Sequence, residues 1–268
     1  MYNKKYALIT GAAGLLGLQH AEALAEIDFH LVLIDIEKNK LNTIYKRLRK
    51  KFTNTNIYPY ICDIRSEKEV KKIQKKLEKN KIFIDVLINN ADVNPKMNKK
   101  NTFTGLVENY NIKGLHQEIS VGIVGTFICS KIFGSKMAKK KGGVIINISS
   151  DLGINAPDHR VYHSSEKIEK VKNFKPIGYS ISKHAISGIT KYLATYWAHK
   201  NVRCNTLVLG SVLGTQSKSL IKNIKKRVPM NRLANVYEYK SAIQFLASDS
   251  SNYMTGQNLI MDGGRTIW

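Results

Sequence analysis

The sequence predicts an α/β fold, in which a doubly wound parallel sheet of seven strands carries helices on both faces. Three observations predict it. Short runs rich in isoleucine, valine and leucine alternate with stretches of helical period along the whole chain. These apolar runs are nearly continuous, as in strands that are buried on both faces. No internal repeat or low-complexity linker interrupts the 268 residues, a length that suits one large domain.

The expected elements alternate from one end of the chain to the other. The strands are Tyr6–Thr10, His30–Asp35, Ile57–Cys62, Ile84–Asn89, Gly143–Ser149, Val202–Val208 and Asn258–Met261. The helices are Leu15–Glu26, Glu37–Phe52, Glu67–Lys79, Gln117–Lys140, Tyr179–Lys200, Ser217–Lys226 and Val236–Ala247. Two polar stretches break the alternation, residues 91–111 and an inserted loop at about 155–176, both within a single domain of residues 1–268. Loops beyond ~12–15 residues in a compact domain are usually functional or disordered.

The net charge of +23 is the strongest feature of the composition. Such a charge can bind nucleic acid, or it can steer a polyanionic cofactor and an acidic substrate toward a site. It can also reflect a general use of lysine without a function. The lysines recur on many expected helix faces, with no interleaved aromatic residues on which bases could stack. This pattern argues against a nucleic-acid partner.

The cysteines and the first residues of the chain indicate the cellular compartment. Cys62, Cys129 and Cys204 each lie in an apolar segment, and none belongs to a paired motif. A strand-like segment begins at Tyr6, which leaves no room for the hydrophobic region of a signal peptide. No apolar run approaches the ~20 residues of a membrane span. These features predict a protein of the reducing cytoplasm, with no membrane contact.

The first strand ends in a glycine-rich turn that leads into a helix. Glycines at positions 11, 14 and 17 allow a tight turn, close approach of the backbone to a pyrophosphate, and close packing of the helix on the sheet. The helix N-terminus then presents free N–H groups and a positive dipole end to the phosphates. A glycine triplet is weak evidence alone, but its place between the first strand and the first helix supports a dinucleotide site. The residues expected to contact the cofactor are Gly11, Ala13, Gly14, Leu15, Leu16 and Gly17.

An acidic residue ends the second strand, about 20 residues after the glycine loop. The carboxylate of Asp35 can accept hydrogen bonds from both ribose hydroxyls of an adenosine, and it would repel a 2′-phosphate. No arginine or lysine lies inside the glycine loop, so the predicted cofactor is NAD rather than NADP. Asp35 could instead cap the helix that begins near Glu37, and the two roles are compatible. Asp63 ends the third strand at the same edge of the sheet.

A tyrosine and a lysine four residues apart supply a candidate acid/base pair. Tyr179 and Lys183 open a helix and share one of its faces. A tyrosine exchanges a proton with an alcohol near neutral pH only if its pKa of ~10 is lowered, and a neighbouring ammonium lowers it. Tyr196 and Lys200 repeat the spacing 17 residues farther along the helix, too far away to share the site. The pair Ser149-Ser150 ends the fifth strand and offers a hydroxyl that could orient a substrate oxygen.

Together with Asn89-Asn90-Ala91 after the fourth strand, these motifs resemble the short-chain dehydrogenase/reductase family. The C-terminal segment is similar to that family's tail, at Pro229, Arg232, Phe245-Leu246-Ala247-Ser248-Asp249, Thr255-Gly256-Gln257 and Asp262-Gly263-Gly264. The resemblance covers essentially the whole chain. It implies a seven-stranded Rossmann sheet that assembles as a homotetramer or a dimer.

The resemblance also implies roles for individual residues. Ser150 would be the catalytic serine, Tyr179 the acid/base, and Lys183 the residue that binds the nicotinamide ribose. The adenosine half of the cofactor would contact Asp63, Ile64 and Asn89, and the nicotinamide amide would contact Val212. Ile36 and Ala91 complete the expected cofactor-binding set.

The chain departs from the family's pattern at several positions. Gly122 falls where the family has a catalytic asparagine, so a water would have to complete the proton relay. Asp92 stands where a glycine is usual, and Leu209-Gly210 stands where Pro-Gly is usual. The insertion at about 155–176 resembles that of short-chain dehydrogenases from flagellin-modification and legionaminic-acid clusters, which would imply a sugar or sugar-phosphate substrate.

The predicted function is therefore NAD-dependent interconversion of a secondary alcohol and a ketone on a sugar-like small molecule. An NADP-dependent ketoreductase of the oxoacyl type is the second interpretation. A catalytically weakened NAD-binding protein, or a basic nucleic-acid-associated protein, is the third, and Gly122 and the net charge motivate it. No metal site is expected, because His159 and His163 lie four residues apart without a third ligand nearby.

Overall fold

Within residues 5–94, 105–162 and 174–268, which the computed structural model describes, seven parallel strands form one sheet in the order β3-β2-β1-β4-β5-β6-β7. The strands are β1 (Tyr6–Thr10), β2 (His30–Asp35), β3 (Ile57–Ile61), β4 (Val86–Asn89), β5 (Gly143–Ser150), β6 (Val202–Leu209) and β7 (Asn258–Met261). The predicted fold class is confirmed. Every predicted strand is present, and its ends lie within two residues of the expected ones.

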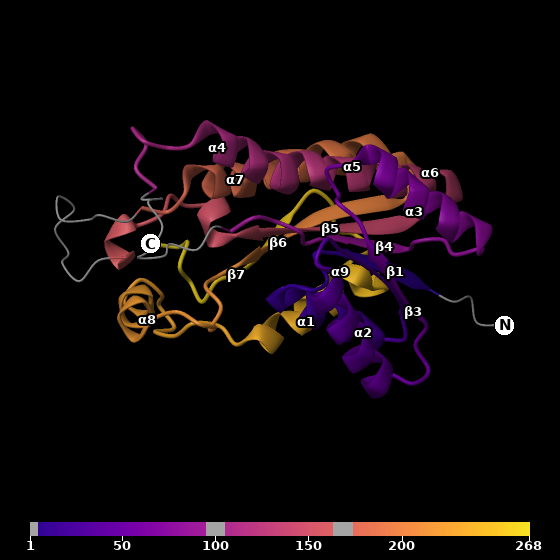
Figure 1. The fold of residues 1–268 in the computed structure, drawn as a ribbon, viewed down its shortest axis with the longest axis horizontal. Helices are drawn as coiled ribbons and strands as arrows, with labels where there is room; N and C mark the ends of the chain where they lie inside the picture. Colours follow the sequence, from indigo (N-terminus) through magenta and orange to yellow (C-terminus); the bar gives the residue numbers. More distant parts are fainter. Residues whose placement is uncertain (1–4, 95–104, 163–173) are drawn as a thin grey trace.

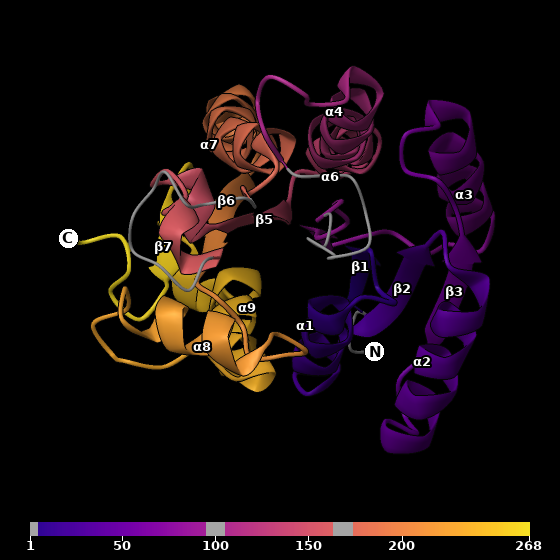
Figure 2. The same ribbon diagram turned by 60° about the vertical axis from the view of Figure 1, so that its left-hand side comes forward.

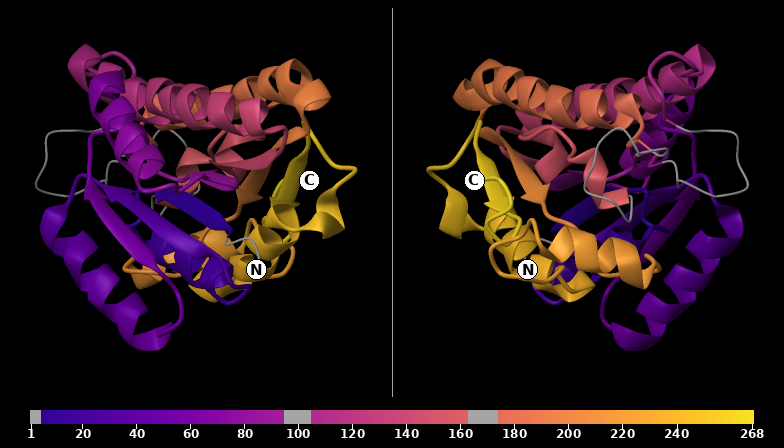
Figure 3. Two further views of the ribbon diagram at one scale, coloured as in Figure 1. Left: turned by 90° about the vertical axis from the view of Figure 1, so that its right-hand side faces the viewer. Right: turned by 90° about the vertical axis from the view of Figure 1, so that its left-hand side faces the viewer.

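Helices cover both faces of the sheet (Figures 1 and 3). One face carries α3 (Glu67–Lys79), the long helix Ile112–Lys140 and α7 (Ile177–Trp197), and the other carries α1 (Leu15–Ala25), α2 (Lys38–Lys51) and α9 (Lys240–Ala247). Successive side chains of a strand point to opposite faces. Ala7 and Ile9 of β1 therefore join the core beneath α1, α2 and α9, while Leu8 joins the core beneath α3 and α7.

The long helix Ile112–Lys140 crosses one face of the sheet and contains π-helical turns. Its segments are α4 (Ile112–Ile119), α5 (Thr126–Cys129) and α6 (Ser135–Lys140), joined at Ser120–Gly125 and Ser130–Gly134. The helix predicted at Gln117–Lys140 starts too late, because the Asn111 side chain accepts the Lys113 N–H and caps an earlier start. Length and apolar composition alone would let this helix cross a membrane, but more than half of its most apolar window is buried inside the molecule.

Two other predicted helices end or begin in tighter turns. α7 becomes a 3₁₀ turn at Ala198–Lys200, and the left-handed Asn201, with a φ of +55°, ends it. The helix predicted at Val236–Ala247 begins with a 3₁₀ turn, Val236–Tyr239, before α9. Both differences concern local hydrogen bonding and leave the path of the chain as expected.

The carboxyl ends of the strands form the edge that holds the site. The strand order reverses between β1 and β4, and open α/β sheets bind ligands in the crevice at such a point. The described part of the inserted loop packs against α8 (Lys218–Lys225) beside this edge (Figure 2). Arg227 donates to Asp158 at 2.8 Å, and Asn223 donates to the Val161 carbonyl at 3.0 Å. Residues 163–173 of the predicted insertion lie outside the described residues.

Candidate active site

A cleft of about 1330 Å³ opens at the carboxyl edge of the sheet. It is lined by nearly all of the predicted site residues, namely Gly11, Ala13, Gly14, Leu15, Leu16, Asp35, Ile36, Asp63, Ile64, Ala91, Ser150, Tyr179, Lys183 and Val212. The two predicted residues that do not line it are Gly17 and Asn89. The fold thus brings the glycine loop and the tyrosine–lysine pair to one cavity, although they lie far apart in the sequence.

The glycine loop turns tightly between β1 and α1. Gly11 has a φ of +62°, and a Cβ at this position would lie 2.7 Å from the Ala91 Cα. A Cβ on Gly17 would lie 2.2 Å from the Gly11 carbonyl oxygen, so Gly17 acts by packing and not by lining the cleft. Gly14 begins α1 without a capping side chain, which leaves N–H groups of the first turn open toward the cleft. This cradle fits the pyrophosphate of a dinucleotide.

Asp35 connects the end of β2 to the glycine loop. Its Oδ2 accepts the Ala13 N–H at 2.8 Å, and its Oδ1 accepts the Glu37 N–H at 2.9 Å. Asp35 therefore holds the loop and also caps the start of α2. Each carboxylate oxygen keeps a further lone pair for a ribose hydroxyl. A 2′-phosphate at the same place would meet the negative charge of Asp35.

Asp63, after β3, is paired with an arginine that the sequence reasoning did not single out. Arg65 Nη2 lies 2.6 Å from Asp63 Oδ2, and its Nε donates to both carboxylate oxygens at 2.9 Å. The Arg65 hydrogen bonds hold the pKa of Asp63 below its ordinary value. Both residues line the cleft, so the positive charge of Arg65 is balanced at the point where the adenosine half is expected.

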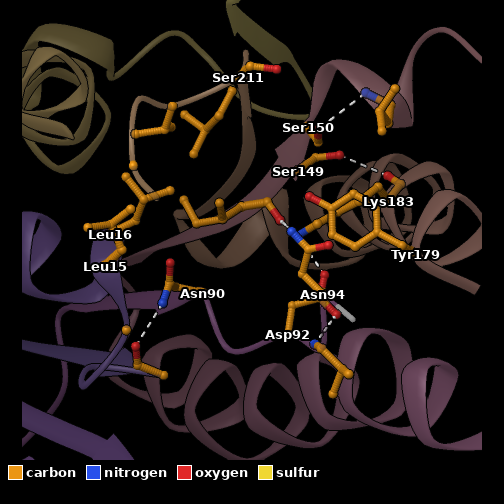
Figure 4. Close-up of a pocket in the computed structure, with 18 of the residues that line it drawn as sticks. Leu15, Leu16, Asn90, Asp92, Asn94, Ser149, Ser150, Tyr179, Lys183 and Ser211 are labelled. Carbon is orange, nitrogen blue, oxygen red and sulfur yellow. Dashed lines mark hydrogen bonds and ion pairs between the residues drawn. The ribbon is translucent and has the colours of Figure 1, made fainter. Parts of the chain in front are cut away.

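Two adjacent asparagines at the end of β4, Asn89 and Asn90, point in different directions. Asn89 is buried, and its amide donates to Asn147 Oδ1 at 2.8 Å inside the protein. Its side chain therefore points into the core and does not line the cleft in which the adenosine half is expected. Asn90 lines the cleft instead, and its Nδ2 donates to the carbonyls of Thr10 and Gly11 at 3.0 Å (Figure 4). Asn90 thus fixes the glycine loop to the end of β4.

The predicted catalytic residues meet on one wall of the cleft (Figure 4). Tyr179 and Lys183 lie one turn apart on α7, and Lys183 Nζ is 5.5 Å from the centre of the Tyr179 ring. The ammonium donates to the Ile148 carbonyl at 2.9 Å, which anchors it to β5. Ser150 is the last residue of β5, and its hydroxyl donates to Asp151 Oδ1 at 2.7 Å. The second pair with this spacing is elsewhere, since Tyr196 lies outside the cleft and is 58% exposed.

Charges of both signs act on the Tyr179 phenol. Burial raises its pKa, and the carboxylates of Asp92 and Asp151 raise it further. The Lys183 ammonium and the Ser150 hydroxyl lower it by favouring the phenolate, but the net shift is upward. A further cation in the cleft would oppose this shift. Proton transfer at neutral pH therefore depends on the cations that surround the phenol.

A second lysine lies at the same tyrosine. Lys175 Nζ is 3.9 Å from the centre of the Tyr179 ring and donates to Asn94 Oδ1. Burial lowers the pKa of Lys175 to about 8, against the opposing effect of nearby carboxylates. The sequence reasoning missed this residue, although Lys175, Tyr179 and Lys183 are spaced four apart. Pro176 begins the helix after Lys175, so helical periodicity did not include it.

The fold and the cleft define a dinucleotide-binding α/β protein with a serine, a tyrosine and a lysine arranged as in nucleotide-dependent oxidoreductases. A family model described as enoyl-(acyl carrier protein) reductase matches residues 11–266. The chain belongs to the short-chain dehydrogenase/reductase family, as the sequence predicted.

Known members of the family are similar over almost the whole chain. The NAD-dependent glycerol dehydrogenase of Listeria innocua is 28% identical over 268 residues, which cover 98% of this chain and 94% of that protein. A short-chain dehydrogenase from Leptospira borgpetersenii, solved with bound NAD⁺, is 28% identical with a TM-score of 0.84, covering 99% of this chain and 94% of the other. A gluconate 5-dehydrogenase from Burkholderia cenocepacia, solved with NADP and tartrate, is 25% identical with a TM-score of 0.84. The match covers 98% of this chain and 96% of that one. NAD and NADP both occur among these proteins, so they support a nicotinamide dinucleotide without selecting one.

Proposed function

We propose that the protein is an NAD-dependent oxidoreductase that interconverts a secondary alcohol and a ketone on a small, polar, sugar-like substrate. One observation carries the proposal. Ser150, Tyr179 and Lys183 lie in the same cleft as a glycine loop whose backbone fits a pyrophosphate. The Ser150 hydroxyl, which donates to Asp151 in this structure, would turn to donate a hydrogen bond to the substrate oxygen, and the Tyr179 phenolate would take the hydroxyl proton. When bound, the nicotinamide supplies or accepts the hydride.

The electrostatics of the wall support this assignment. Burial raises the pKa of Tyr179, and the Lys183 ammonium opposes this rise by favouring the phenolate. An oxidised nicotinamide is cationic and would lower the pKa of the phenol further. The phenol would then reach its reactive form when oxidised cofactor is present, which matches the direction of alcohol oxidation.

The preference for NAD rests on charge at the end of β2. Asp35 already faces the glycine loop, where it would accept ribose hydroxyls and repel a 2′-phosphate. Two cations of the cleft could hold such a phosphate: Arg65 is engaged by Asp63, and Lys40 Nζ lies 3.9 Å from Glu37 Oε2. The oxoacyl-type ketoreductase with NADP is the alternative that a reversed preference would support.

The polar lining of the cleft and the named relatives support a sugar-like substrate. Asn94, Asp151, Lys175 and Arg265 line the cleft and can bind hydroxyl groups. The relatives include a glycerol dehydrogenase and a gluconate 5-dehydrogenase, whose substrates are polyhydroxylated. The insertion at about 155–176 favours the sugars of flagellin-modification and legionaminic-acid clusters within this class. We further propose a cytoplasmic homo-oligomer, a tetramer or a dimer.

Substitution of Tyr179 tests the proposed function directly. Tyr179→Phe removes the acid/base group without changing the ring, so turnover of a polyol or sugar acid should fall by at least about 100-fold. NADH binding, followed by fluorescence, should stay nearly unchanged. Tyr196→Phe is the matched control, because Tyr196 lies on the same helix and outside the cleft. Turnover of Tyr179→Phe equal to that of Tyr196→Phe would contradict the assignment.

A further inference from the structure

A nearly buried carboxylate contacts the lysine of the site (Figure 4). Asp92 Oδ2 lies 2.8 Å from Lys183 Nζ, and the two side chains are only 11% and 7% exposed. The other oxygen, Oδ1, accepts the Val93 N–H at 2.8 Å, so a local hydrogen bond fixes the orientation of the carboxylate. A lysine ammonium has three donors. The Ile148 carbonyl takes one of them, and Asp92 pairs with the ammonium by charge.

The space for this carboxylate comes from Gly122, on the long helix. A Cβ at position 122 would lie 2.8 Å from Asp92 Oδ1 and 2.9 Å from the Ser182 Cβ. Such distances are too short for a carbon atom, so no side chain fits at position 122 while Asp92 keeps this place. Asp92 and Gly122 were two separate departures in the sequence. In the structure they are neighbours, and each accounts for the other.

We propose that Asp92 is a positioning residue for Lys183, that it sets the pH range in which the Tyr179–Lys183 pair works, and that Gly122 provides the space for it. The proposal rests on the proposed function, in which Tyr179 is the acid/base.

The charges around the phenol come from several elements. Lys183 belongs to α7 and Lys175 to the segment before it, Asp92 follows β4, Asp151 follows β5, Glu118 belongs to α4, and Tyr162 belongs to the inserted loop. Asp92 is the member of this set that forms an ion pair with Lys183. It balances the ammonium that would otherwise favour the phenolate most strongly.

The direction of the effect follows from these contacts. Burial lowers the pKa of Lys183, but Asp92 and then Tyr179 raise it, so that it lies above its ordinary value. Asp92 also raises the pKa of Tyr179. Removing the charge of Asp92 should therefore lower both pKa values. Turnover needs the phenolate and the ammonium together, so both limbs of its pH profile should move to lower pH.

Asp92→Asn tests this inference, because it removes the charge and keeps the shape. We expect both limbs of the profile of kcat to shift down by about one pH unit. The alkaline loss of NADH affinity, which reports the Lys183 ammonium without turnover, should shift in the same direction. Asp92→Ser removes the charge with a smaller side chain and should give the same shift, which guards against misfolding of one variant.

Asp85→Asn is the matched control, because Asp85 forms a similar ion pair at the other end of β4, where Lys140 Nζ lies 2.9 Å from it. This variant should leave the profile in place. A purely structural role for Asp92 would lower kcat or yield without moving the pH limbs. Profiles and NADH titrations that coincide with those of the unaltered protein would overturn the inference. Full turnover in Tyr179→Phe would instead overturn the proposed function, so the two failures are distinguishable.

Discussion

At the scale of single residues, the sequence identified most of the site because its members have recognisable chemistry at strand and helix ends. Tyr179 could be chosen over Tyr196 from the distance that separates them along the helix, and of the two the structure places Tyr179 in the cleft. Side-chain direction could not be read in the same way. Asn89 and Asn90 are adjacent and identical, yet the first points into the core and the second holds the glycine loop. Asp92 was visible as a departure, but its contact with Lys183 depends on packing.

The cofactor preference is a residue-scale prediction. Asp35→Ser removes the charge that would face a 2′-phosphate and keeps a small polar group beside the Ala13 N–H. We expect the ratio of NADP to NAD affinity to rise by about 10- to 100-fold, which corresponds to ~1–3 kcal/mol. Fluorescence titration with NADH and NADPH measures it. Glu78→Gln is the matched control, because it removes a carboxylate that pairs with Lys136 outside the cleft, and it should leave the ratio unchanged. An unchanged ratio in Asp35→Ser would show that another group selects the cofactor.

At the scale of elements, hydrophobic periodicity located the strands and helices well, because each buries at least one apolar face. Periodicity did not locate the ends of helices that are set by a single capping or helix-breaking side chain. The Asn111 cap lengthens the long helix, and Pro176 excludes Lys175 from α7. The length of the inserted loop was visible in the sequence, but the element against which it packs was not. Asp158 of this loop accepts from Arg227, just after α8, so the contact joins residues 69 apart in the chain, which no local pattern encodes.

The junction of the glycine loop with α1 provides the element-scale prediction. In Gly17→Ala the new Cβ would collide with the Gly11 carbonyl, so the loop and the first turn of α1 must move apart. We expect a loss of ~1–3 kcal/mol in the free energy of unfolding and much weaker NADH binding. Gly188→Ala, on α7, is the matched control, because nothing lies within 4 Å of its Cβ. It should gain about 0.5–1 kcal/mol and bind NADH normally. Urea unfolding and NADH titration of both variants check this, and normal binding by Gly17→Ala would contradict it.

At the scale of the whole molecule, the topology follows from the alternation of strands and helices with few alternatives, since parallel connections are right-handed and short. The net charge of +23 was harder to interpret, because a sum says nothing about arrangement. Around the cleft the structure places charges of both signs, with Arg65 beside Asp63 and Lys183 beside Asp92. This mixed arrangement suits a small polar ligand better than a polyanionic backbone, which a uniformly basic surface would bind.

Assembly is the prediction that belongs to the whole molecule. The long helix and α7 lie side by side on one face, and they expose Phe127 and Tyr196 by 46% and 58%. Apolar groups exposed in this way on adjacent helices favour burial against a second copy of the chain. We expect a dimer or tetramer in light scattering coupled to size exclusion, and a smaller species for the double variant Phe127→Glu/Tyr196→Glu. Tyr237→Glu alters a tyrosine that is 60% exposed outside these helices and should leave the mass unchanged. A monomeric unaltered protein, or a double variant of unaltered mass, would show that this face is not the interface.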